Sequence, residues 1–215
     1  MFSTIQAAIS DLKAHKMVIV VDDENRENEG DFIIPAAAIT PKDVNFMATH
    51  GRGLICAPIA ASLAKKYALE LMIDRPEDSM QTAFTISVDA AHGTSTGISV
   101  QDRATTLRLL ADPNTCADDF VKPGHIFPLI AKSGGVLSRP GHTEAAIDLC
   151  SLAGFSPAGV ICEILDEDGS SARLPYLSRL AQRFDLKIIT IEDLIIYRNT
   201  KLEIHHQESA SHVNY

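Results

Sequence analysis

The sequence predicts one α/β (α+β) domain in which helices flank a mixed β-sheet. Short apolar runs rich in β-branched residues, typical of buried strands, alternate along the chain with amphipathic helical segments. Residues 82–89 alternate apolar and polar side chains, which favours a mixed sheet over a purely parallel one. The chain has 215 residues, 46% of them apolar, and no internal repeat or linker-like stretch. We therefore place one domain at residues 1–200 and expect residues 201–215 to form a mobile tail.

The first half of the chain predicts two helices and four strands. Ser3 with Gln6 three residues later is typical of a capping box that opens a helix. Thr40 followed by Pro41 indicates the start of a second helix, and Gly51 its end. Strands are expected at residues 17–21, 32–34, 54–58 and 82–89.

The second half continues the alternation of helices and strands. A loop of small residues leads to a capped helix start at Ser99, and residues 112–124 are expected to be irregular. The next helix ends at Gly154, and an amphipathic helix covers residues 174–184. A short helix begins at Glu192, and the chain after Arg198 shows no periodicity. Strands are expected at residues 125–130, 159–165 and 187–190.

Composition and charge exclude several classes of protein. The net charge is −9 and no cluster of Lys and Arg occurs, which argues against a nucleic-acid or anionic-membrane partner. No run approaches the roughly 18 apolar residues of a membrane span, and the N-terminal segment lacks a basic stretch followed by an apolar one. The four cysteines lack zinc-ligand spacing. These features predict a cytoplasmic protein with reduced thiols.

An acidic loop at residues 22–31, DDENRENEGD, places six carboxylates and one arginine between two predicted strands. Asn25, Asn28 and Gly30 tolerate left-handed backbone conformations, so the loop can be shaped rather than merely solvated. Converging carboxylates repel one another, and a hard divalent cation with oxygen ligands relieves that repulsion. The alternative is an acidic surface hairpin.

Two segments offer anion-binding features. Arg139, His142 and Thr143 stand at a predicted helix start, where backbone N–H groups and arginine favour a phosphate. Alternatively, Thr143 only caps the helix and Arg139 pairs with a surface carboxylate. The loop at residues 92–97 could present amides and hydroxyls to an anion, or be an ordinary loop.

Glu163 interrupts an otherwise apolar strand. A carboxylate in such surroundings must be paired, bind a cation or carry a raised pKa suited to proton transfer, unless this face of the sheet is wet. His125 stands at the mouth of a strand and is by itself a weaker candidate. Cys56 lies in an apolar strand and is expected to be buried and inert, with a substrate-facing role as the alternative.

Five segments together resemble the 3,4-dihydroxy-2-butanone 4-phosphate synthase family. They are residues 22–31, 50–56, 82–89 with the following loop, 124–129 and 139–154, and the resemblance runs to about Glu163. It implies a lyase of riboflavin biosynthesis that converts D-ribulose 5-phosphate to 3,4-dihydroxy-2-butanone 4-phosphate and formate. It also implies a mixed-sheet homodimer with sites near the subunit interface, which needs Mg²⁺ or Mn²⁺, one ion or two per subunit, and no organic cofactor.

The resemblance also implies roles for individual residues. Glu27 and His142 become metal ligands, and His125 and Glu163 the catalytic pair. The residues expected to bind the substrate are Arg26, Glu27, Asp31, Arg139, Pro140, Gly141, His142, Thr143 and Glu163.

Two positions depart from the family pattern. Asn25 stands where an aspartate is usual, and Pro140 stiffens the turn before Gly141. The chain lacks the GTP cyclohydrolase domain of bifunctional relatives, so a monofunctional enzyme is expected. Two alternatives stay open: a non-catalytic sugar-phosphate sensor, and a metal-dependent phosphosugar isomerase or aldolase.

Overall fold

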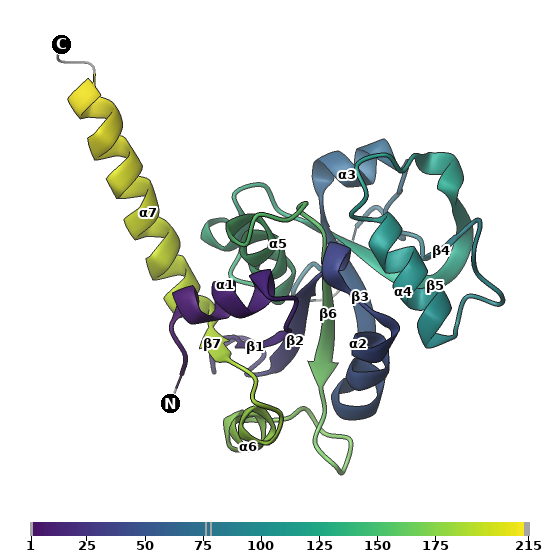
Figure 1. Cartoon of the computed structure of the whole chain (residues 1–215), viewed down its shortest axis with the longest axis horizontal. Coiled ribbons are helices and arrows are strands. Elements are labelled where there is room, and N and C mark those ends of the chain that lie inside the picture. The colour runs from purple at the N-terminus through teal and green to yellow at the C-terminus, as the bar shows by residue number, and fades with distance from the viewer. Residues whose placement is uncertain (1, 76, 78, 213–215) are drawn as a thin grey trace.

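The structure is a computed structural model that describes residues 2–75, 77 and 79–212, with side chains described up to Glu203. Its strands are β1 (Val18–Val21), β2 (Gly30–Pro35), β3 (Arg52–Ala60), β4 (Val88–Ala90), β5 (Phe120–Ala131), β6 (Gly159–Ile164) and β7 (Ile188–Thr190). They form one seven-stranded sheet in the order β4-β5-β3-β6-β2-β1-β7 (Figure 1). The pairs β1–β7 and β3–β5 are parallel and the other neighbours are antiparallel. The predicted mixed sheet flanked by helices is therefore confirmed.

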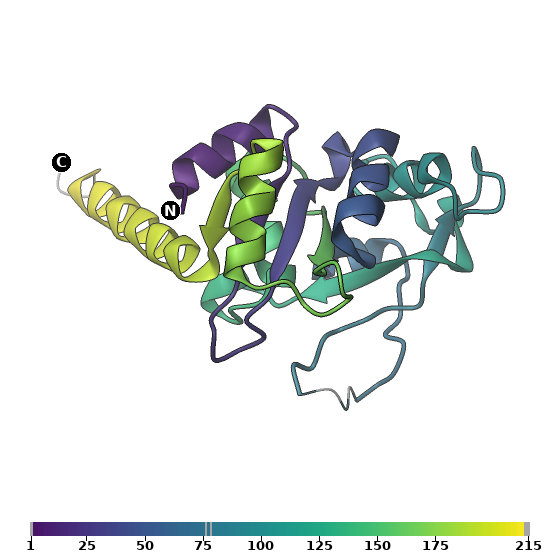
Figure 2. The same cartoon turned by 90° about the horizontal axis from the view of Figure 1, so that it is seen from below.

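Helices cover both faces of this sheet (Figures 1 and 2). They are α1 (Ile5–Lys13), α2 (Pro41–Phe46), α3 (Ala61–Lys66), α4 (Val100–Leu109), α5 (His142–Leu152), α6 (Leu174–Phe184) and α7 (Ile191–His212). Helices α1 and α5 and the start of α7 share one apolar core with Val18, Ile33 and Ile161. Helices α2, α3, α4 and α6 share the other, with Phe32 and Ile34. The alternation of strand side chains between faces builds both cores.

Local capping explains where two of the helices begin. Thr40 accepts a hydrogen bond from the Asp43 N–H, and Pro41 occupies the first turn of α2, as predicted. The predicted cap of α1 is wrong by one residue, because the hydroxyl of Thr4, not Ser3, accepts from the Ala7 N–H at 3.2 Å. Ser3 precedes the cap, and its N–H donates to the Ile188 carbonyl oxygen at 2.7 Å.

Residues 82–89 do not form the regular strand that we predicted. Phe84 makes only an isolated bridge to Leu129, and continuous pairing starts at Val88. The predicted faces are also wrong, since Thr85 is fully buried and Ile86 is 36% exposed. The Thr85 hydroxyl satisfies its hydrogen bond by donating to the Pro128 carbonyl oxygen at 3.2 Å.

Strand β5 is longer than predicted at its start. We expected residues 112–124 to be irregular, yet β5 begins at Phe120, which pairs with Ala90. The register between β4 and β5 shifts between Val88 and Asp89, and this irregularity accommodates Pro123 and Gly124 within the strand.

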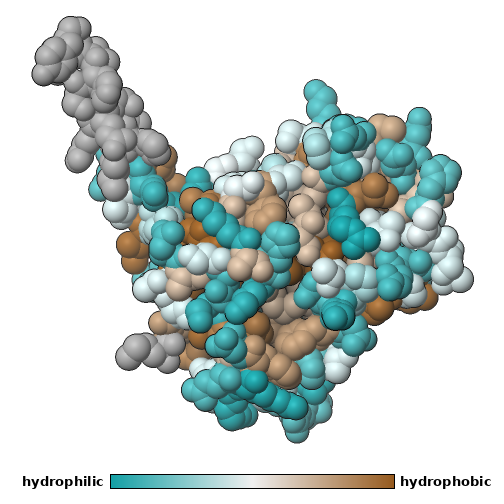
Figure 3. All heavy atoms as spheres, in the orientation of Figure 1, coloured by the Kyte–Doolittle hydropathy of each residue, from teal (hydrophilic) through white to brown (hydrophobic). Residues whose placement is uncertain are grey.

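Helix α7 replaces the short helix that we predicted from Glu192. It continues to His212 and projects away from the sheet, beside α1 at its base (Figure 1). The mobility of residues 201–215 stays a prediction, and residues 213–215 lie outside the described residues. In Figure 3, hydrophilic residues cover much of the visible face and apolar patches interrupt them. In the described part of the chain, no helix combines the length and hydropathy that crossing a membrane requires.

Candidate active site

The acidic loop between β1 and β2 is folded around the side chain of Asp22. One oxygen of this fully buried carboxylate accepts from Arg26 Nη1 at 2.8 Å and the Glu27 N–H at 3.1 Å, and the other accepts from the Glu29 N–H at 2.8 Å. Asn28 adopts a left-handed conformation with φ of 56°. The loop is therefore shaped by its own hydrogen bonds, as its composition predicted.

Residues 171–173, which follow the turn after β6, hold this loop in place through hydrogen bonds. Arg173 Nη1 donates to the Glu27 carbonyl oxygen at 2.9 Å and also to that of Asn28. The Ser171 hydroxyl donates to Glu29 Oε1 at 2.6 Å. Sequence reasoning gave neither contact, because nothing in the spacing links these residues to the loop.

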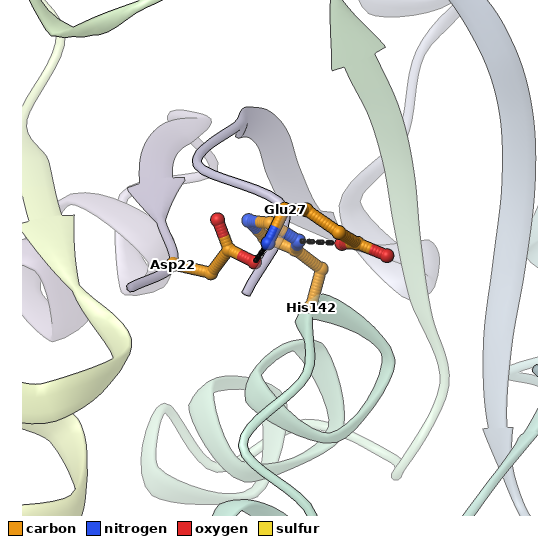
Figure 4. A group of neighbouring side chains, drawn as sticks. All are labelled: Asp22, Glu27 and His142. Carbon is orange, nitrogen blue, oxygen red and sulfur yellow. Dashed lines mark hydrogen bonds and ion pairs between the residues drawn. The ribbon is translucent and has the colours of Figure 1, made fainter. Parts of the chain in front are cut away.

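His142, the first residue of α5, brings a nitrogen ligand to the loop (Figure 4). Its Nδ1 lies 3.7 Å from Glu27 Oε2 and 3.9 Å from Asp31 Oδ1. Its Nε2 lies 3.1 Å from the Val20 carbonyl oxygen. Because a carbonyl oxygen can only accept a hydrogen bond, Nε2 must carry a proton and donate it. Nδ1 is then the nitrogen available to the carboxylates, an arrangement typical of metal-binding histidines.

Electrostatics favour a positive charge at this point. Burial by itself lowers the pKa of His142, but the carboxylates of Asp31, Glu27 and Asp22 outweigh burial and raise it to about 9. The neighbouring His142, with its Nδ1 3.7 Å from Glu27 Oε2, is the largest cause that lowers the pKa of Glu27, to about 2. A bound cation can replace the proton on His142 and supply the same positive charge.

The donor set fits a divalent cation. One ligand atom from each of Asp22, Glu27 and His142 lies within 4.8 Å of the other two. Carboxylate oxygens suit Mg²⁺, and the imidazole nitrogen suits Mn²⁺ better. Both oxygens of Asp22 accept hydrogen bonds from the loop, whereas within the described part of the chain Glu27 accepts only at Oε2, from Arg26 Nη1 at 2.5 Å, so Glu27 and His142 are the freer ligands.

Asp31 and Glu163 face each other across the pairing of β2 and β6. Burial is the largest cause that raises the pKa of Asp31 to about 7, and burial likewise raises the pKa of Glu163. The negative charge of Glu163 adds to the rise in the pKa of Asp31, as is typical of paired carboxyl groups in one site. Glu163 Oε2 accepts from the Leu54 N–H at 2.7 Å, so the side chain is held in place. A raised pKa is one of the alternatives that its apolar strand predicted.

Arg139 reaches the same region from the turn before α5. Its Nη1 donates to Glu144 Oε2 at 2.6 Å and its Nη2 to the Met80 carbonyl oxygen at 3.0 Å. Glu144 is 1% exposed, so Arg139 is paired with a buried carboxylate, not the surface one of our alternative. The N-cap of α5 is Gly141, so the alternative that Thr143 caps the helix is also wrong.

One cavity of about 130 Å³ collects most of the predicted site residues. Cys56 also lines it, which the substrate-facing alternative predicted, and burial raises the pKa of its thiol, which the expectation of an inert cysteine predicted. Pro140 and Gly141 do not line the cavity and form the turn that leads into α5. The predicted site residues in its lining are Arg26, Glu27, Asp31, Arg139, His142, Thr143 and Glu163.

His125 does not line that cavity. It lies on β5, and β3 separates it from Glu163 on β6. Its ring Nδ1 lies 2.6 Å from Asp89 Oδ2, and its side chain is 41% exposed. Within the described residues, the structure therefore does not bring the predicted catalytic pair into direct contact in one chain.

Comparisons with known proteins identify the family. Residues 6–197 match the family model described as 3,4-dihydroxy-2-butanone 4-phosphate synthase. The chain is 59% identical to riboflavin biosynthesis protein RibBA of Bacillus mycoides over 198 aligned residues. The aligned region covers 92% of this chain and 50% of that protein. RibBA of Bacillus cytotoxicus is 58% identical with the same coverage. The chain thus spans about half the length of the curated relatives it matches.

Two solved structures are similar over nearly the whole chain. RibBX, a two-domain 3,4-dihydroxy-2-butanone 4-phosphate synthase from A. baumannii, is 47% identical with a TM-score of 0.88, covering 91% of this chain and 58% of that one. A 3,4-dihydroxy-2-butanone 4-phosphate synthase in complex with two magnesium ions is 41% identical with a TM-score of 0.90, covering 93% of this chain and 98% of that one.

Proposed function

The chain belongs to the 3,4-dihydroxy-2-butanone 4-phosphate synthase family, and we propose that it is a lyase of riboflavin biosynthesis. Its reaction converts D-ribulose 5-phosphate to 3,4-dihydroxy-2-butanone 4-phosphate and formate. One observation supports this proposal most strongly. Glu27 and His142, far apart in the sequence, meet at 3.7 Å in the wall of a cavity that Arg139 and Glu163 also line.

Glu27 and His142 would hold a Mg²⁺ or Mn²⁺ ion. When bound, such an ion polarises a carbonyl group and stabilises negative charge that develops beside it. A related synthase was solved with two magnesium ions, so a second ion per subunit is part of the proposal. Asp31, 3.9 Å from the His142 ring, is the nearest further carboxylate.

Arg139 and the start of α5 would receive the phosphate of the sugar. The backbone N–H groups of the first helical turn have no partner within the helix, and the helix dipole favours an anion there. Gly141 leaves room for the arginine, because a Cβ at this position would collide with Arg139 Nη1. The Thr143 hydroxyl adds a donor, and Pro140 stiffens the turn. Arg26, held by Asp22 and Glu27, faces the same cavity.

Acidic residues of the cavity would move the protons. Asp31, whose pKa is raised to about 7, is matched to removing the C3 proton near neutral pH. Loss of the C1 hydroxyl, migration of the terminal carbon and hydrolytic release of C4 as formate follow. Glu163, whose pKa is also raised, exchanges protons in these steps, and His125, which lies outside the cavity of its own chain, would join from the second subunit of a dimer.

We also propose that the chain is a homodimer. Four large apolar side chains around β3, β4 and β5 are between 36% and 54% exposed, which is costly in water and is relieved in an interface. They are Leu54, Ile86, Ile98 and Val121. Light scattering after gel filtration should give twice the monomer mass of 23.3 kDa; a monomer would remove this part of the proposal.

Formate release tests the proposed function. Purified chain incubated with D-ribulose 5-phosphate and Mg²⁺ should produce formate, measured with formate dehydrogenase, and excess chelator should stop the production. A sugar-phosphate sensor would bind the sugar and make no formate. A phosphosugar isomerase or aldolase would consume it without making formate, and either outcome would overturn the proposal.

A further inference from the structure

The pairing of His125 with Asp89 has a geometry that defines which ring nitrogen carries the proton. Asp89 Oδ2 lies 2.6 Å from His125 Nδ1, and Asp89 Oδ1 accepts from the His125 backbone N–H at 2.9 Å. A carboxylate can only accept, so the neutral ring must carry its proton on Nδ1. We propose that Asp89 is a positioning residue that fixes this tautomer and leaves His125 Nε2 free to exchange protons with the substrate. This inference rests on the proposed function of His125.

The backbone on both sides builds this pair. The register shift between β4 and β5 follows Val88, so the chain at Gly124 and His125 approaches β4 closely. A Cβ on Gly124 would collide with the backbone of Val88 and Asp89, and the Gly124 N–H donates to Ser87 Oγ at 3.1 Å. A shift of this kind redirects a side chain. Here it turns His125 toward Asp89.

The loop at residues 92–98 covers the pair. Gly97, with φ of 94°, lies so close that a Cβ there would collide with Asp89 Oδ2 and His125 Nδ1. Asp102, 5% exposed, fixes this loop by accepting from the Ser95 hydroxyl at 2.7 Å and from the Gly97 N–H at 3.1 Å. The small-residue loop of the sequence thus encloses Asp89, which is 7% exposed, and its amides at Ser95 and Gly97 donate to the carboxylate of Asp102.

Replacing Asp89 by asparagine should reverse the tautomer with little change in shape. The His125 backbone N–H always donates, so the asparagine oxygen must face it and the amide NH₂ must face Nδ1. The ring must then carry its proton on Nε2. The corresponding change in Ser-His-Asp triads lowers kcat by about 10⁴-fold because the tautomer is wrong. For Asp89→Asn we expect kcat to fall by about 10²-fold or more, with KM within about twofold, because proton transfer is affected and sugar binding is not.

Asp148→Asn is the matched control. Asp148 is also a buried aspartate that accepts a backbone N–H, from Val136 at 2.8 Å, and a side-chain donor, Arg198 Nη1 at 2.7 Å. It has no contact with His125 among its hydrogen bonds. Its replacement should cost stability without changing kcat or the state of the His125 ring, so it separates loss of a buried carboxylate from loss of the tautomer.

The experiment combines kinetics with ¹H–¹⁵N NMR of ¹⁵N-histidine-labelled holoenzyme at mildly alkaline pH, where an ordinary imidazole is neutral. The signals of His125 are assigned by their loss in His125→Gln. Support requires an Nδ1–H ring in the wild type and an Nε2–H ring with reduced kcat in Asp89→Asn. An Nε2–H ring in the wild type, or an unchanged kcat in folded Asp89→Asn, would overturn the inference. An Nδ1–H ring in a wild-type chain that makes no formate would instead overturn the proposed function and leave the hold of Asp89 on the ring intact.

Discussion

Replacing Glu163 by glutamine should move activity and stability in opposite directions. Glutamine keeps an oxygen that can accept from the Leu54 N–H, a contact of 2.7 Å in the wild type. It removes the negative charge opposite Asp31 and the capacity for proton transfer. We expect kcat for formate release to fall by about 10²- to 10⁴-fold, the range that general acid–base catalysis contributes.

The stability change follows from the raised pKa of Glu163, which burial chiefly causes. A carboxyl group whose pKa is raised on folding destabilises the fold at pH values above the folded pKa, and a tenfold change in its proton affinity corresponds to about 1.4 kcal/mol. In metal-free protein at alkaline pH, Glu163→Gln should therefore raise the free energy of unfolding. The gain should vanish as the pH falls toward the unfolded value of 4.5, where the wild-type group becomes protonated in both states.

Urea unfolding at alkaline pH and near the unfolded pKa of 4.5 measures the stability change. A coupled formate assay measures the change in kcat. Glu167→Gln, an exposed change in the turn that follows β6, should leave both unchanged. Turnover of Glu163→Gln at the wild-type rate would remove Glu163 from the mechanism. A loss of stability at alkaline pH would show that the ionised carboxylate is favoured in the fold, against the reasoning above.

Three further predictions concern the neighbours of Glu163 and the metal ligands. In Gly53→Ala the new Cβ would lie 2.7 Å from Glu163 Oε2 and 2.5 Å from the Glu163 carbonyl oxygen, so kcat should fall and urea unfolding should show a loss of about 1–3 kcal/mol; wild-type kinetics would contradict a fixed carboxylate. His142→Gln should weaken Mg²⁺ binding by at least about tenfold in calorimetry, and unchanged affinity would exclude His142 as a ligand. Because the pKa of His142 is raised from 6.5 to about 9, its contribution to stability is complete below 6.5 and is lost as the pH rises through about 9. In excess chelator, the melting temperature should fall as the pH rises from 6.5 to about 9, and with Mg²⁺ present it should fall less. The same pH dependence of the melting temperature with and without Mg²⁺ would contradict the idea that a bound cation replaces the proton on His142.

Sequence patterns predicted the fold class and several side chains of the site. Glu163 could be found because a carboxylate interrupts an apolar strand, and the acidic loop because its turn residues and flanking strands are local features. The pairing of Glu27 with His142 came only from the resemblance, since histidine is an unusual magnesium ligand and spacing does not connect a loop to a distant helix start.

Long-range contacts were the part that patterns could not supply. Asp89 and Glu144 are ordinary acidic residues in the sequence, and only the register of β4 with β5 and the turn before α5 bring them against His125 and Arg139. The error at residues 82–89 has the same origin. Alternation there suggested two clean faces, but Thr85 is buried because its hydroxyl finds a partner on β5.

The fate of one carbon atom tests the account most directly. D-Ribulose 5-phosphate labelled with ¹³C at C4 is incubated with the chain and Mg²⁺ and followed by ¹³C NMR. We predict that the label appears in formate while an unlabelled four-carbon phosphorylated ketone accumulates. Label that stays within a five-carbon sugar phosphate, or that passes into an aldol fragment, would contradict the proposed reaction.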